Sequence, residues 1–202
     1  MVGHKIVNRL AFVLVVASFA AASPAAAQLG GMNGNDLVEA VKKSDGDKAI
    51  QILANKPKGI VDSKDGDGNT GLIIAINRGD EQWTGWLLNQ GANINLGGKG
   101  GDTPLIAAAR VGFSQAATWL IALGAKVDTA NRMGETPLII AVQLRQIPMI
   151  RFLLEHGANP DKVDAAQGYS ARQYAERDNR GRQILQMIEA KKPKASAAAA
   201  AK

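Results

Sequence analysis

Cysteine is absent from this 202-residue sequence, and histidine occurs only twice. Without cysteine the chain has no disulfide, no thiol nucleophile and no thiolate metal ligand, so its fold must rest on an apolar core. His156 is the one histidine beyond the N-terminal segment, and a single histidine without a cysteine or a second histidine is a poor metal ligand or catalytic base. We expect His156 to lie at the end of a helix, where the helix dipole favours a cationic side chain.

Charge of one sign is not concentrated along the chain. Residues 1–27 carry two of the 24 basic residues and none of the 18 acidic ones, so the remainder has a formal net charge of +4. Part of that excess lies in residues 191–202, a stretch rich in lysine and alanine. We expect this stretch to be a disordered, solubilising tail, with weak attraction to an anionic membrane or cell-wall polymer as the alternative. Nucleic-acid binding requires a dense basic surface, and none is expected here.

Two short segments resemble ligand-binding loops but lack the residues that define them. Asp65–Asn69 is similar to the start of an EF-hand calcium loop, whose sixth and twelfth positions need glycine and glutamate, whereas this chain has Thr70 and Ile76. In Gly97–Gly101 a glycine follows Lys99, whereas a P-loop needs serine or threonine there. We expect both segments to be turns. The acids form no convincing catalytic pair, so the sequence predicts no enzyme, no metal and no cofactor.

The longest apolar run is short. Residues 10–22 follow a basic start at Lys5 and Arg9 and precede a small-residue stretch that ends at Ala27. A membrane-spanning helix needs about 20 apolar residues, so this pattern favours a secretory signal peptide over an uncleaved anchor. We expect cleavage after Ala27, followed by a short linker over residues 28–34.

A 33-residue repeat dominates the rest of the chain. Thr70, Thr103 and Thr136 lie 33 residues apart in the similar segments GNTGLIIA, GDTPLIAA and GETPLIIA. Later landmarks keep the same period: Leu87-Leu88, Leu120-Ile121 and Leu153-Leu154, and then Gly91-Ala92, Gly124-Ala125 and Gly157-Ala158. Several independent landmarks at one spacing indicate a solenoid of stacked units.

This pattern resembles the ankyrin repeat, with its Gly-x-Thr-Pro-Leu opening and Leu-Leu-x-x-Gly-Ala close. The resemblance implies an all-α ankyrin-repeat solenoid of about five stacked helix-turn-helix units with short hairpin loops. The histidine that usually follows Thr-Pro-Leu is isoleucine here, at Ile73, Ile106 and Ile139, so the hydrogen bond of that histidine to the threonine is absent. Weaker copies flank the three clear ones, which gives an ankyrin-repeat domain over 35–190 with repeats at about 35–65, 66–98, 99–131, 132–165 and 166–190.

The repeat also predicts where its helices begin and end. Each threonine can cap a helix by accepting a backbone N–H bond, and Pro104 and Pro137 occupy the first helical position, where a missing N–H costs nothing. Gly112 ends the first helix of its repeat, and a second helix runs from about Gln115 to Leu123 before Gly124.

One aromatic column supports stacking. Trp86, Trp119 and Phe152 precede the Leu-Leu pair in the middle repeats, whereas Gln51 and Gln186 stand there in the terminal ones. A polar residue in the end repeats is what solubility requires. We therefore interpret the aromatic residues as packing between neighbouring outer helices, in preference to a ligand platform.

The resemblance also implies a partner-binding surface, made of the hairpin tips and the exposed side of each first helix. Arginine and methionine are enriched at protein interfaces, which draws attention to Met133 among these positions. The candidate residues are Asn77, Arg78, Arg110, Val111, Gln143 and Leu144 on first helices, and Lys99, Asp102, Arg132, Met133 and Glu135 in hairpins.

The sequence thus predicts a probably-unnamed class of function only through its surface: a non-catalytic protein-interaction module or scaffold, exported to the bacterial envelope, periplasmic or secreted, and monomeric. A secreted effector that acts on host proteins through the same surface is the alternative, and a second, non-repeat region would favour it. An unrecognised enzyme is the third hypothesis, to be tested by a hydrolase screen.

Overall fold

The structure, a computed structural model, describes residues 34–54 and 59–190. The expected signal peptide, the linker up to residue 33 and the C-terminal tail lie outside the described residues. Within the described ranges the regular structure is helical, and the only β contacts are two isolated bridges, Lys64 with Thr70 and Val163 with Ser170. No helix there has the length and apolar character that a bilayer crossing needs.

The helices form five consecutive antiparallel pairs over residues 34–54 and 59–190. The pairs are α1 (Gly34–Lys43) with α2 (Gly46–Ala54), α3 (Gly71–Asn77) with α4 (Glu81–Asn89), α5 (Pro104–Val111) with α6 (Ser114–Ala122), α7 (Pro137–Gln143) with α8 (Ile147–Glu155), and α9 (Ala171–Arg177) with α10 (Arg182–Ala190). Two short 3-10 turns, Ile60–Asp62 and Lys99–Gly101, lie in the connections between pairs.

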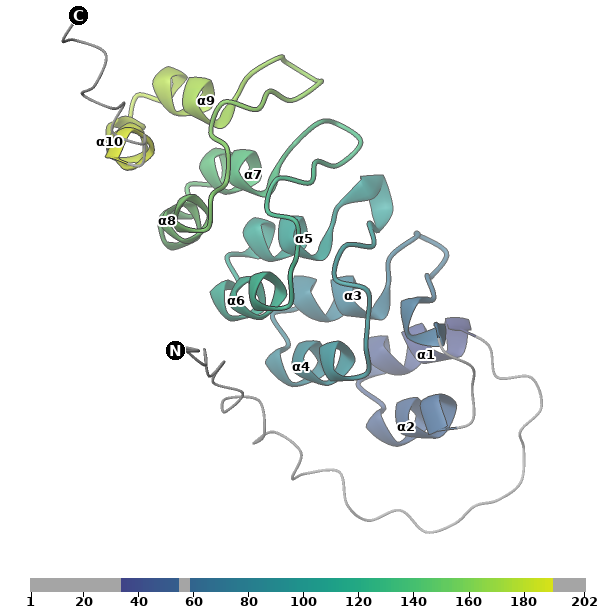
Figure 1. The fold of residues 1–202 in the computed structure, drawn as a ribbon. Helices are drawn as coiled ribbons and strands as arrows, with labels where there is room; N and C mark the ends of the chain where they lie inside the picture. Colours follow the sequence, from purple (N-terminus) through teal and green to yellow (C-terminus); the bar gives the residue numbers. More distant parts are fainter. Residues whose placement is uncertain (1–33, 55–58, 191–202) are drawn as a thin grey trace, which may run out of the picture.

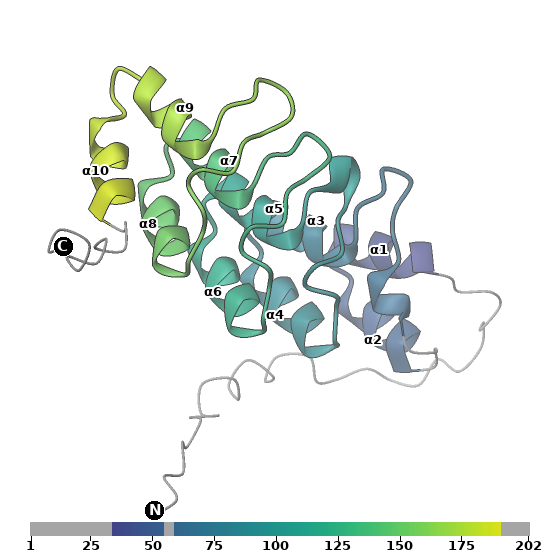
Figure 2. The ribbon, with the colours of Figure 1, turned by 45° about the horizontal axis from the view of Figure 1, so that its top comes forward.

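The pairs stack in sequence order into an all-α solenoid. The first helices α1, α3, α5, α7 and α9 form one row in which each contacts the next, and the second helices from α4 to α10 form a parallel row. Hairpin loops project from one side of the first row (Figures 1 and 2). This arrangement confirms the predicted fold class.

Helix starts follow the threonine pattern. Thr70, Thr103 and Thr136 are buried, and the Oγ1 atom of each accepts the backbone N–H three residues later at 3.2–3.3 Å. Ser170 does the same for α9 and completes a capping box with Gln173. The polar residue at the head of each first helix therefore satisfies a donor that would otherwise be buried without a partner.

Helix ends were predicted to within one residue. Gly112 has φ 71° at the end of α5, as expected. The second helix of that repeat spans Ser114–Ala122, one residue earlier at each end than predicted, because Leu123 is the C-cap and still lies in the helical region before Gly124 turns left-handed at φ 94°. His156 is likewise the C-cap of α8, and its Nδ1 lies 2.7 Å from the Phe152 carbonyl oxygen.

Apolar side chains between the two rows form one continuous core. Ile73, Ile106 and Ile139, which replace the usual histidine, are at most 1% exposed, so burial takes the place of that hydrogen bond. Trp119 packs on the neighbouring outer helix, since a Cβ placed on Gly85 of α4 would lie 3.6 Å from its ring. Gln51 and Gln186, in the same column of the end repeats, are exposed. The packing interpretation of the aromatic column is consistent with these contacts.

A second polar ladder runs along the loops that follow the outer helices. The Oδ1 atoms of Asp62, Asn95 and Asp128 accept the backbone N–H of Asn93, Lys126 and Asn159, at 2.7, 3.0 and 3.0 Å. Each acceptor belongs to one repeat and each donor to the next. The period is again 33 residues, and the last member of the series, Asp161, accepts the Nε–H of Arg172 at 2.6 Å. The ladder fixes the register of neighbouring repeats.

Candidate partner-binding surface

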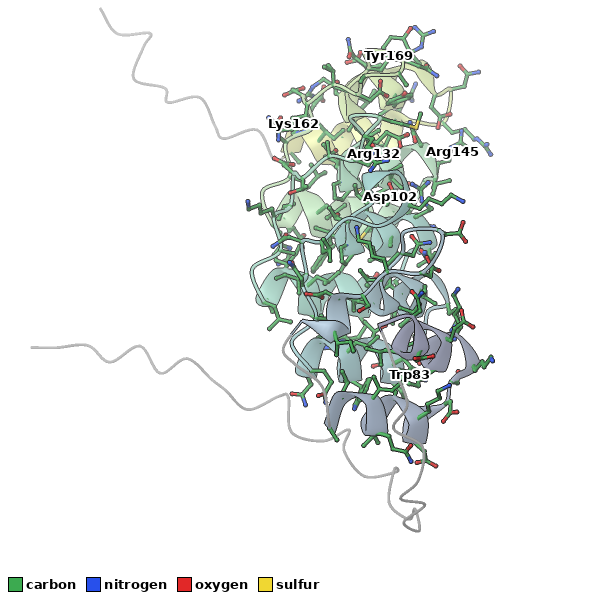
Figure 3. All side chains as sticks on the ribbon, turned by 90° about the vertical axis from the view of Figure 1, so that its right-hand side faces the viewer. Trp83, Asp102, Arg132, Arg145, Lys162 and Tyr169 are labelled. Carbon is green, nitrogen blue, oxygen red and sulfur yellow. The ribbon has the colours of Figure 1, made fainter. Side chains whose placement is uncertain are left out.

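The predicted first-helix residues all lie on one side of the solenoid. Asn77 and Arg78, Arg110 and Val111, and Gln143 and Leu144 occupy equivalent places at the ends of α3, α5 and α7, and all six are exposed. We call the exposed side of α3, α5, α7 and α9, together with the hairpins that precede these helices, the inner-helix face. Figure 3 looks onto the side of the molecule where Asp102 and Arg132 lie.

The hairpins on this face are tied to one another through their backbones. The N–H of Arg132 donates to the Gly100 carbonyl at 2.9 Å, and the N–H of Ala165 donates to the Met133 carbonyl at 2.8 Å. Further along, the Lys99 N–H donates to the Asn69 side chain at 3.0 Å. The tips that carry Lys99, Arg132 and Met133 are therefore held as a row, so the surface they present is formed before any partner binds.

Three of the predicted residues belong to a single polar network. Asp102 accepts the Arg110 guanidinium at 2.7 Å through Oδ2 and the Asn131 amide at 2.8 Å through Oδ1. The same amide donates to Glu135 at 2.8 Å. Asn131, which the sequence analysis did not select, thus joins the acids of two adjacent repeats. Its place in the turn, two and four residues before the backbone N–H groups it accepts, was a detectable signal.

Arg78 is occupied by the protein itself. Its Nη1 atom donates to the carbonyls of Val41 and Lys42 at 2.8 and 3.0 Å, and its Nη2 atom donates to Ser44 and Asp80 at 3.1 and 2.6 Å. These carbonyls belong to the last turn of α1, where no intrahelical donor reaches them. Arg78 therefore caps the preceding repeat, which leaves fewer donors for a partner than the sequence position suggested.

Exposed apolar groups gather on the inner-helix face. Val111 and Leu144 are 41% and 48% exposed at equivalent positions of α5 and α7, and Met133 is 53% exposed at a hairpin tip. Arg132, beside Met133, forms no side-chain hydrogen bond or ion pair with any residue that the structure describes. Apolar and arginine side chains of this kind supply much of the energy at protein interfaces.

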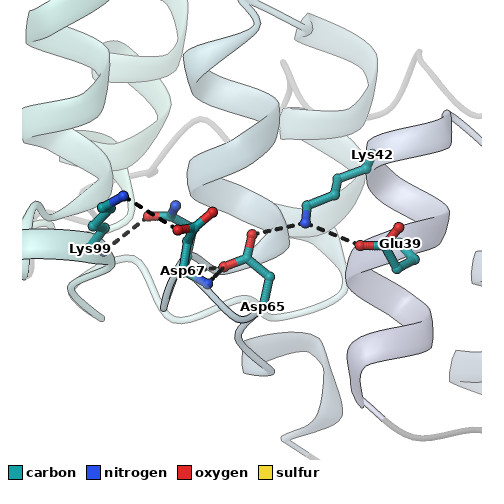
Figure 4. Close-up of polar contacts among 6 residues, drawn as sticks. Glu39, Lys42, Asp65, Asp67 and Lys99 are labelled. Carbon is teal, nitrogen blue, oxygen red and sulfur yellow. Dashed lines mark hydrogen bonds and ion pairs between the residues drawn. The ribbon is translucent and has the colours of Figure 1, made fainter.

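The segments that resembled ligand loops are turns. Asp65 accepts the backbone N–H groups of Asp67 and Asn69 and the ammonium group of Lys42, which also contacts Glu39 (Figure 4). Burial raises the pKa of Asp65, but the Asn69 N–H and Lys42 outweigh it and hold that pKa below its ordinary value. Lys99 pairs with Asp67 at 3.3 Å. Among the described residues no group of three metal-ligating side chains converges.

The fifth repeat contains a buried acid that the sequence analysis missed. Asp164 is 3% exposed and accepts the backbone N–H groups of Gln167 and Gly168 and the hydroxyl of Tyr174 at 2.5 Å. Burial raises the pKa of Asp164, but these donors, Tyr174 first, bring it below its ordinary value. Burial and the bond to Asp164 raise the pKa of Tyr174. The pair anchors the last hairpin to α9.

The stacked helix pairs and their hairpins place the chain in the class of helical repeat solenoids. Comparison with protein families is more specific: the model of the family "Ankyrin repeats (3 copies)" matches residues 37–131 and 85–164. The chain belongs to the ankyrin-repeat family. A search of curated proteins finds no match. Ankyrin repeats are generally protein-interaction modules and typically non-catalytic, so a protein partner is implied. The fifth helix pair lies beyond the matched residues and is placed by the structure alone.

Proposed function

We propose that this chain is an exported scaffold of the bacterial envelope that binds a protein partner through its inner-helix face and performs no catalysis. The observation that carries the proposal is the gathering of Val111, Leu144 and Met133, all exposed, beside Arg110 and Arg132 on that face. An apolar centre with arginine at its edge is the composition of a protein interface.

The geometry supports binding without rearrangement. The hairpin tips are linked by backbone hydrogen bonds, and Asp102, Arg110 and Glu135 are already held in place through Asn131. A partner therefore meets ordered side chains, and less conformational entropy is lost on association than with flexible loops. The polar groups in this network have protein partners, which suits recognition better than proton transfer to a substrate.

Export is proposed from the sequence of residues 1–27 alone. The basic start, the short apolar run and the small residues before Gln28 form the expected signal-peptide pattern. N-terminal sequencing of the protein recovered from the native organism tests it. We expect the chain to begin at Gln28, and a chain that begins at Met1 would contradict cleavage.

The binding surface is tested with a matched pair of substitutions. Leu144→Glu changes the C-cap of α7 on the inner-helix face, and Leu123→Glu changes the C-cap of α6 on the outer row; the two leucines are 48% and 49% exposed. Both variants should unfold alike. We expect the first to weaken capture of the partner from envelope extract about tenfold and the second to leave it within about twofold.

A complementary variant combines substitutions of Arg110, Arg132 and Met133, and it should lose the same partner without a change in thermal unfolding. If Leu144→Glu and the triple variant capture that partner as well as the unmodified chain does, the inner-helix face is not the binding surface.

A further inference from the structure

The fourth and fifth repeats differ from the others where their inner helices end. Gly79 and Gly112 follow α3 and α5 with positive φ, but the equivalent position after α7 is Arg145, at φ 54°. A side chain in this left-handed region costs about 1–2 kcal/mol relative to glycine. The position keeps an arginine despite that strain, and its side chain reaches across to the fifth repeat.

A cleft opens between α7 and α9 at this place. Its volume is about 340 Å³, and it is lined by Val142, Gln143, Arg145, Tyr174, Arg177 and Asp178. Tyr174 stands where α3, α5 and α7 carry Ile74, Ala107 and Ile140, so an aromatic ring with a polar end forms part of the wall. The cleft lies on the inner-helix face, at its C-terminal end.

The charges of the cleft leave cationic groups in excess. Arg145 donates through both Nε, at 2.7 Å, and Nη2 to the carboxylate of Asp178. The backbone N–H of Arg180, and then Arg145, lower the pKa of Asp178, which is therefore ionised and matched to Arg145 at neutral pH. Arg177 has no such acid opposite it.

Arg177 is oriented but has unused donors. Its guanidinium lies 4.6 Å from the centre of the Tyr169 ring, and Tyr169 in turn meets Tyr174 edge to face at 5.6 Å. No described residue forms a hydrogen bond or an ion pair with the Arg177 side chain. Stacking fixes the plane of a guanidinium while its N–H groups stay available, which is a geometry that suits a carboxylate.

We propose that this cleft binds an aspartate or glutamate side chain of the protein partner, with Arg177 as the group that recognises the carboxylate. The inference rests on the proposed function and adds to it the chemistry of the partner: an acidic segment that crosses the end of α7 and α9. Gln143 and Tyr174 line the same space and limit what enters it beside the carboxylate.

A peptide titration of the full chain tests the cleft directly. The probe is an acetylated hexaglutamate peptide, with hexaglutamine as its uncharged counterpart, and the readout is the NMR signal of each arginine Nε–H group. The variants are Arg177→Gln and, as a matched control, Arg151→Gln, an exposed arginine on the outer helix α8 that also lacks a hydrogen-bond partner in the described structure. Inorganic phosphate and phosphatidylglycerol vesicles are separate arms.

We expect hexaglutamate to shift the Arg177 signal, Arg177→Gln to weaken its binding about tenfold, and Arg151→Gln to leave it within about twofold. Equal weakening by both substitutions would indicate general attraction to a basic protein and overturn the proposal. So would the lack of saturation at millimolar peptide, or a preference for phosphate or vesicles over the peptide.

The partner-capture experiment separates this inference from the function on which it rests. If Leu144→Glu abolishes capture and Arg177→Gln does not alter it, the inner-helix face is the binding surface but the cleft is not its acidic-residue site. If neither variant alters capture, both proposals fail. Loss of capture in both variants, with Arg151→Gln unaffected, supports both.

Discussion

Replacing Arg78 by methionine is expected to detach the first repeat from the second. Methionine keeps an apolar stem of similar length but removes the guanidinium, which donates two bonds to the end of α1 and one each to Ser44 and Asp80. The carbonyl of Val41 is partly buried, so water replaces its lost donor only in part. The other three bonds are at the surface.

The magnitude follows from those two kinds of bond. A hydrogen bond from a charged donor to a buried group contributes about 1.5–3 kcal/mol, whereas an exposed ion pair such as that with Asp80 contributes about 0–1 kcal/mol. With the Arg78 side chain 33% exposed, we discount the first figure and expect a loss of about 1.5 kcal/mol in total. In a solenoid each repeat contacts only its neighbours, so this loss falls on the interface of α1 with α3.

Urea unfolding and amide hydrogen exchange measure the effect. Asn77→Ala is the control, because Asn77 is the exposed neighbour with no such bonds. In Arg78→Met the amides of α1 should exchange about tenfold faster than in the control, while those of α7 and α8 keep their protection. Identical unfolding midpoints and identical α1 exchange in the two variants would refute the capping role of Arg78.

Two further predictions concern the hairpins. Gly134→Ala should destabilise the fold by more than Gly124→Ala: both residues have positive φ, but a Cβ at Gly134 would lie 2.6 Å from the Ala165 backbone nitrogen, whereas Gly124 has nothing within 4 Å. Gly124→Ala should cost about 1 kcal/mol from strain alone, and equal losses in urea unfolding would contradict the close approach. Asp164→Asn keeps the turn acceptor and removes the charge. Because the pKa of Asp164 is lowered by folding, its contribution is present above the unfolded value of about 3.9 and is lost as pH falls through the folded value. The stability gap between the unmodified chain and this variant should therefore shrink below about pH 4, and a gap that stays constant from pH 7 to pH 3 would count against the assignment.

The architecture could be predicted because each repeat carries its own local instructions. Thr103 and Pro104 start a helix for reasons that lie within a few residues, and Gly112 ends it in the same way. The one-residue shift of α6 came from Leu123, whose helical conformation as a C-cap has no distinctive residue type to mark it. Local rules locate elements well and their last residue less well.

Contacts between repeats were harder to predict. That Arg78 reaches the end of α1, or that Arg145 pairs with Asp178, depends on how far one unit is displaced from the next, which no short segment specifies. The ladder through Asp62, Asn95 and Asp128 was within reach, because an Asp or Asn recurs there every 33 residues. It was missed because polar loop residues were read as solvent-exposed rather than as acceptors for the next repeat.

The ladder also bears on how such a chain can change in length. An acceptor at one rung and its donor 31 residues later are interchangeable between rungs, so excising 33 residues from the middle would bring Asn95 to the donor that Asp128 now serves. Removing 32 or 34 would leave that junction out of step. The molecule can thus be shortened or extended by whole modules, with the size of the permitted step written into its loops.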